Sequence, residues 1–139
     1  MITCVAMILG VSLTELPALA LNVESEARAL TTQTEVTPGF LTQIQTFSGD
    51  AERLSVALRE AGVAQDLPCI FHGISQDANA RVTELQNANT DTERTMAFND
   101  LHALLSDAML IAPMAASAAA DRVAAEADHS VQSASNEAH

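Results

Sequence analysis

The sequence predicts an all-α protein: a small antiparallel helical bundle of three main helices that follows a cleavable N-terminal signal. Its 139 residues are 48% hydrophobic but include no Trp or Tyr and only four Phe. The core is therefore aliphatic, which suits close-packed helices better than strands. Apolar residues also recur every three or four positions over three long stretches, which is the period of an amphipathic helix.

Residues 1–20 have the features of an export signal. An uncharged apolar run, Cys4 to Leu13, is followed by Pro17 and by the tripeptide "ALA" that ends at Ala20, which fits the small-x-small cleavage pattern. The cut is expected after Ala20, in a periplasmic or secreted protein of a Gram-negative-type envelope. Glu15 and Pro17 interrupt the run, so no stable membrane insertion is expected. The alternative is a buried first helix that a cytosolic oligomer retains.

The region that follows the predicted cut, residues 21–39, reads as a weakly ordered lead-in rich in Thr, Gln and Glu that ends with Pro38-Gly39. A short helix capped by Asn22 is the alternative, with Val23, Ala27 and Leu30 on one side. The helical bundle is expected over residues 40–128, and residues 129–139 read as a frayed tail.

The first main helix is predicted from about Phe40 to Ala61. Its apolar residues are spaced alternately four and three apart, an uninterrupted heptad pattern that crosses Gly49 in phase. They are Phe40, Ile44, Phe47, Ala51, Leu54, Leu58 and Ala61. Gly62 then offers a C-terminal stop.

The second helix is predicted from near Asp66, a plausible N-cap, to Leu85, with Pro68 tolerated in the first turn. The segment "QNANTD", residues 86–91, is rich in residues that favour turns.

The third helix opens with Thr90-x-x-Glu93, a capping-box pattern, and its apolar stripe runs from Phe98 to Ala119. Residues 108–112, "AMLIA", are apolar on every side, so this helix is expected to lie centrally in the bundle. Pro113 should kink the helix, because its ring removes one backbone hydrogen bond.

The net charge of −12 excludes several partner classes, and all six basic residues are Arg. Binding to DNA or RNA requires a basic surface, as does docking on anionic lipid through a polybasic patch. A protein partner is expected, or self-association, because the apolar stripes bury little for a monomer and the heptad pattern of residues 40–61 suits a further helix. No nucleic acid is expected.

Cys69-x-x-His72, in "DLPCIFHG", is the sharpest chemical pattern. The two side chains lie about 60° apart on a helix, with Cys69 nearly opposite the apolar stripe and His72 close beside it, so the pair is expected to face solvent. A zinc site needs further Cys or His ligands, and none stands at metal spacing. After the predicted cut, Cys69 is the sole cysteine. We therefore expect an exposed, oxidisable thiol that can form an intermolecular disulfide, with an inert or buried thiol as the alternative.

His102 lies at the edge of the third helix's stripe, with Met109 on the stripe and Met96 and Met114 opposite. Histidine and methionine together could ligate haem or copper, but methionine at helical spacing usually fills a core. The acidic residues, such as Asp100 and Asp107, read as spread along outer faces rather than paired.

No catalytic constellation, metal site or cofactor site is predicted. The function expected from the sequence is therefore a non-enzymatic protein-binding or structural module of the periplasm. The alternative is a periplasmic bundle that binds a metal, haem or a small apolar ligand.

Overall fold

The computed structural model describes residues 11–63 and 66–137, and this part of the chain is helical throughout apart from short connections. A 3₁₀ turn, Leu13–Glu15, leads into α1, Leu16–Thr31. Three further helices follow: α2, Pro38–Glu60; α3, Leu67–Asn87; and α4, Asp91–Glu137. The all-α prediction is confirmed, whereas the prediction of three main helices is wrong, because four helices pack against one another.

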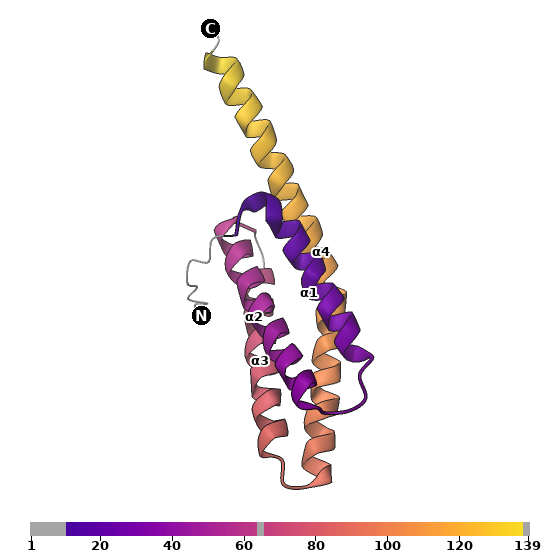
Figure 1. Ribbon diagram of the computed structural model, residues 1–139. Coiled ribbons are helices and arrows are strands. Elements are labelled where there is room, and N and C mark those ends of the chain that lie inside the picture. The colour runs from indigo at the N-terminus through magenta and orange to yellow at the C-terminus, as the bar shows by residue number, and fades with distance from the viewer. Residues whose placement is uncertain (1–10, 64–65, 138–139) are drawn as a thin grey trace.

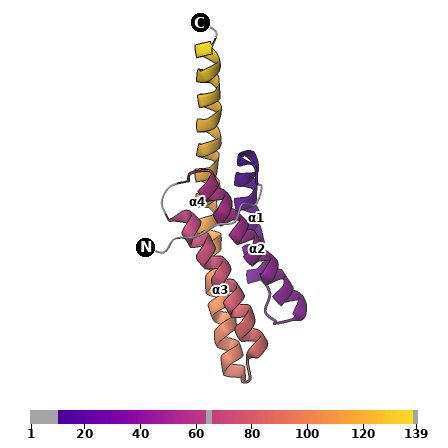
Figure 2. The same ribbon diagram turned by 90° about the vertical axis from the view of Figure 1, so that its left-hand side faces the viewer.

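Successive helices run in opposite directions along one long axis (Figure 1). The most extensive contacts join α1 to α4 and α2 to α3, and smaller ones join α3 to α4 and α1 to α2. The C-terminal part of α4 extends alone beyond the other three helices, as both views show (Figures 1 and 2). The fold is therefore bundle-like, with one helix that outgrows it.

Helix α1 consists of residues that were expected to form the end of the signal and the start of the lead-in. Pro17 occupies its first turn, and its apolar residues repeat at helical spacing on one buried face: Leu16, Leu19, Ala20, Val23, Ala27 and Leu30. The expected weak order of residues 21–39 is wrong for residues 21–31, which complete α1, and for Pro38 and Gly39, which begin α2. The expected cut after Ala20 falls in the middle of α1. Most of the expected apolar run, which was Cys4 to Leu13, lies outside the described residues.

Helix α2 follows the heptad prediction closely. Its first six predicted seam residues, from Phe40 to Leu58, are all buried, and the helix continues through Gly49. Thr37 caps its start, because its side-chain oxygen accepts a hydrogen bond from the Phe40 N–H at 3.0 Å. Gly62, with φ of 72°, ends it, and the Val63 N–H returns to the Leu58 carbonyl at 3.0 Å. This is a glycine stop of the kind predicted.

Three buried serines let α2 and α3 approach each other. The Ser48 hydroxyl donates to the Ser75 carbonyl at 2.8 Å and lies 3.0 Å from the Ser75 hydroxyl. Nearer the other end of the contact, the Ser55 hydroxyl donates to the carbonyl of Pro68. Small side chains that satisfy their own hydroxyls permit this close contact without leaving unpaired buried polar groups.

Helix α4 begins as its capping pattern predicts: the Thr90 side chain accepts from the Glu93 N–H at 3.1 Å. The Glu93 carboxylate in turn accepts from the Asn89 N–H at 2.8 Å. The helix continues past Pro113 as far as Glu137, so the tail expected to fray from residue 129 is helical over most of its length. Figure 1 shows that the direction of α4 changes along its length.

Candidate functional site

Three large apolar side chains of α4 are exposed and lie on one side of the helix. We define the outer face of α4 by Met96, Leu110 and Met114, which are 62%, 74% and 59% exposed. Leu110 follows Met96 by four turns, and Met114 follows Leu110 by one turn, so the three share one side of the helix. The expected central position of α4 is therefore wrong, because only its inner side contacts α1 and α3.

The inner side of α4 explains why the large residues point outward. From residue 108 onward its fully buried residues are all alanine: Ala108, Ala112, Ala115 and Ala119. Alanine allows neighbouring helices to approach closely, and the large side chains of α1 fill the space opposite. An apolar run of this kind predicts burial but does not say which of its side chains the neighbouring helices will cover.

A shallow apolar groove borders the outer face, with a volume of about 480 Å³. Six residues line it: Leu67, Pro113, Met114, Ser117, Ala118 and Asp121. Asp121 is its charged member, and Asp107 also lies exposed on α4. Asp100 is exposed too but is paired with Arg81 at 3.4 Å. The outer face of α4 therefore combines apolar side chains with an acidic border.

Helix α4 is also long and apolar enough to cross a membrane, by length and composition alone. The core helix of a soluble protein can pass the same test. Here the inner side of the helix is packed on α1 and α3.

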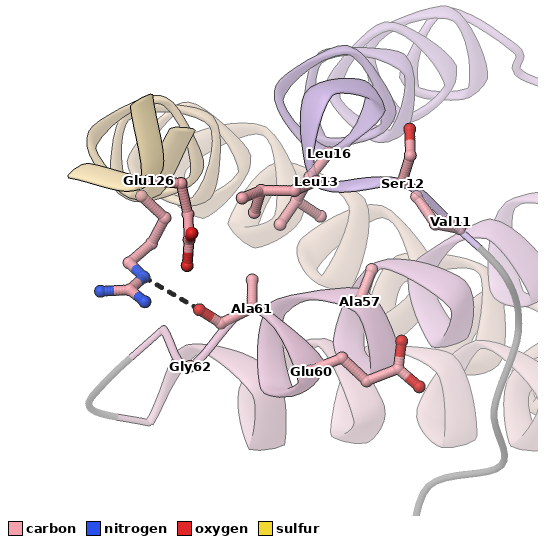
Figure 3. A pocket seen from close by; sticks show the side chains of 10 residues that line it. Val11, Ser12, Leu13, Leu16, Ala57, Glu60, Ala61, Gly62 and Glu126 are labelled. Carbon is pink, nitrogen blue, oxygen red and sulfur yellow. Dashed lines mark hydrogen bonds between the residues drawn. The ribbon is translucent and has the colours of Figure 1, made fainter. Parts of the chain in front are cut away.

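A second concave site lies at the end of the bundle where α1 begins and α2 ends (Figure 3). Its volume is about 290 Å³, and Leu13 and Leu16 form its apolar wall. On the other side, the Arg122 Nε–H of α4 donates to the Ala61 carbonyl at 2.9 Å. This contact places a cation at the C-terminal end of α2, where the helix dipole favours it. Glu60 and Glu126 complete the polar part of the lining.

The structure separates the members of the Cys69-x-x-His72 pattern. Cys69 is exposed in the first turn of α3, as the helical spacing predicts. The His72 Nδ1 instead lies 2.8 Å from the Glu52 carboxylate of α2, where both side chains are partly buried. Among the described residues, no three His, Cys, Asp or Glu side chains are grouped so that they could hold a metal ion. Oxidation of Cys69 to an intermolecular disulfide stays a prediction.

His102 does not meet the methionines that would complete a haem or copper site. Its ring lies against Phe98, with centroids 4.4 Å apart, and its Nε2 is buried without a hydrogen-bond partner among the described residues. Met96 and Met114 point to the exposed outer face instead. Met109, partly buried, accepts a weak hydrogen bond from the Thr31 hydroxyl of α1 at 4.0 Å. The arrangement is that of packing residues.

One acidic pair contradicts the expectation that the carboxylates are spread apart. Glu26 of α1 and Asp50 of α2 face each other across the seam between their helices, and the Asn22 amide bridges them. Burial raises the pKa of Glu26 to about 7, and the hydrogen bond and charge of Asp50 add to this effect. One feature of the sequence pointed to the pair: Glu26 lies one turn from Val23 and Leu30, which are both buried. From the sequence, this helix was only the alternative to a weakly ordered lead-in.

No protein family, no curated protein and no solved structure matches this chain.

Proposed function

We propose that this protein is a non-enzymatic binding module that holds a basic amphipathic helix of a partner protein on the outer face of α4. The observation that carries the proposal is the row of exposed Met96, Leu110 and Met114 beside acidic residues. A large apolar side chain gains roughly 1.5–3 kcal/mol when it is fully buried. A partner that covers this row would recover that free energy.

The spacing and charge of the outer face specify the chemistry of the partner. Leu110 and Met114 lie one helical turn apart, so a helix with apolar residues at the same spacing fits beside them. Lys or Arg on that helix would face Asp107 and Asp121. An anionic membrane would meet the same aspartates and be repelled, and a second copy of this chain would present a second acidic border.

A designed peptide provides the test. Isothermal titration calorimetry would measure the affinity of the protein for an amphipathic helical peptide of Leu and Lys. The control peptide has the same composition in a scrambled order that has no apolar face. The amphipathic peptide should bind more tightly, and its affinity should fall as salt screens the aspartates. Replacing both Leu110 and Met114 by Gln should weaken binding tenfold or more.

The matched control is Leu21→Gln, because Leu21 of α1 is exposed but lies outside the outer face of α4. This variant should bind the peptide as the original protein does. Equal affinity of the two peptides, or equal binding by the Leu110/Met114 double variant, would refute the proposal. Binding to vesicles of anionic lipid in preference to the peptide would refute it as well.

A second candidate function has one specific support. The pocket beside Leu13 and Leu16 has an apolar wall, which suits a small apolar ligand. Native mass spectrometry of protein purified from its own host would reveal such a ligand as added mass. Loss of that mass in a Leu16→Ala variant that remains folded would favour this second function.

A further inference from the structure

The carboxyl groups of Glu26 and Asp50 are held at close range between two different helices. The Asn22 amide donates to Glu26 Oε1 at 2.9 Å and lies 3.5 Å from Asp50 Oδ2. On the far side, Arg53 of α2 donates to Asp50 Oδ1 at 3.1 Å. Asp50 therefore has a half-exposed cationic partner on its own helix, whereas Glu26 has only a neutral amide as its partner.

The second oxygen of Glu26, Oε2, is buried and accepts no hydrogen bond from any described residue. A buried, unpaired carboxylate oxygen is costly when the group is ionised. A protonated carboxyl removes that cost, because its O–H can donate to Asp50 and the two groups then share one negative charge. Loss of the proton removes this bond and places two like charges on opposite helices.

The seam between α1 and α2 is also the place where a repulsion would have most effect. Helix α1 makes its larger contact with α4 and a smaller one with α2. A cleft of about 260 Å³ already lies between them beside Glu26, with Leu30 and Thr46 among its lining residues. Near the connection, a hydrogen bond of 2.6 Å between Gln33 and Gln43 also crosses the seam.

We propose that Glu26 and Asp50 form a pH-sensitive latch between α1 and α2, closed by a proton that the two carboxyls share and loosened when that proton is lost. The groups that act on Glu26 are Asn22 on its own helix and Asp50 and Arg53 on α2, and among the described residues no charged group of α4 acts on it. The latch does not depend on the outer face of α4.

The direction of the pH dependence follows from the two states. The pKa of Glu26 is about 7 in the folded protein, above its ordinary value of 4.5. The folded protein therefore holds the proton more tightly than the unfolded chain. The latch is fully closed below about pH 4.5, and its stabilisation is lost as the pH rises through about 7.

Hydrogen exchange of the backbone amides tests this directly. We would compare protection at pH 5.5 and pH 8, corrected for the intrinsic exchange rate at each pH. Protection of the residues of α1 should fall at least threefold at pH 8, while protection of α3 stays constant. In Glu26→Gln, whose amide stays neutral and can still donate to Asp50, protection of α1 should not change with pH.

The matched control is Glu24→Gln, because Glu24 lies on the same helix and pairs with Arg28 at 2.6 Å rather than with α2. It should keep the original pH dependence. A second variant, Asp50→Asn, removes the like charge and should reduce the pH dependence without abolishing it, because the burial of Glu26 remains. Unchanged protection of α1 in the original protein, or a fall that persists in Glu26→Gln, would overturn the proposal.

Discussion

Removing residues 1–20, as the predicted cut after Ala20 would do, should strongly destabilise the fold. The deletion takes Leu16, Leu19 and Ala20, which are 1%, 9% and 0% exposed, out of the core. Burying the two leucines contributes roughly 3–6 kcal/mol, as an upper estimate for an extended unfolded chain. A domain of this size is stable by only about 5–15 kcal/mol. The deletion should therefore remove a large part of the free energy of unfolding.

Urea denaturation followed by circular dichroism measures the effect. A chain that begins at Leu21 should unfold at a much lower urea concentration than the full chain, or be partly unfolded in water. The matched control begins at Val11 and keeps every described residue of α1, so its unfolding midpoint should lie closer to that of the full chain. Equal stability of the chains that begin at Val11 and Leu21 would refute the assignment of Leu16 and Leu19 to the core.

The comparison of the chains that begin at Val11 and Leu21 also tests whether a chain cut after Ala20 could remain folded after export. If the protein is exported and cut after Ala20, the mature chain keeps Val23, Ala27 and Leu30 but loses the first turns of α1. Intact mass spectrometry of protein from its host would show whether the chain begins at Leu21. A chain that begins there and is as stable as one that begins at Val11 would support the export prediction and show that α1 needs no more than residues 21–31.

Three further predictions concern single side chains. Ser48→Ala should destabilise the protein by about 1–2 kcal/mol in thermal unfolding, because the hydrogen bonds to Ser75 are lost in a buried contact; no change would contradict their role. Leu105→Ala should lower the free energy of unfolding by about 2–5 kcal/mol, because Leu105 is buried. Leu110→Ala, on the same helix but 74% exposed, should change it by less than about 0.5 kcal/mol. Equal losses in the two variants would contradict the orientation of α4. Non-reducing electrophoresis should show a dimer band that Cys69→Ser abolishes, and its absence would end the disulfide prediction.

Local signals explain which parts of the fold could be predicted. The heptad seam of α2, the Thr90 cap and the Gly62 stop each depend on a few neighbouring residues, and each is present in the structure. Their physical causes are local: side chains one turn apart share a face, a threonine oxygen satisfies a free N–H, and glycine adopts positive φ without strain.

The start of helix α1 was interpreted as an export signal because two patterns share the same residues. A helix core needs apolar residues at helical spacing, and an export signal needs an apolar run that ends in small residues. Leu16, Leu19 and Ala20 satisfy both. The packing of α1 on α4, a contact between residues far apart in the sequence, shows that these residues are buried in the fold, and export stays a prediction. The Glu26–Asp50 pair was lost for the same reason, because it exists only where α1 lies beside α2.

The composition of α4 is the strongest argument that its outer face has a role beyond folding. In an ordinary amphipathic helix the large apolar residues face the core and the small or polar ones face water. Beyond residue 108 this helix does the reverse, with alanines fully buried and with Leu110 and Met114 exposed. Folding gains little from a leucine that is 74% exposed. When an apolar partner covers Leu110 and Met114, their burial supplies a stabilisation that folding alone does not provide.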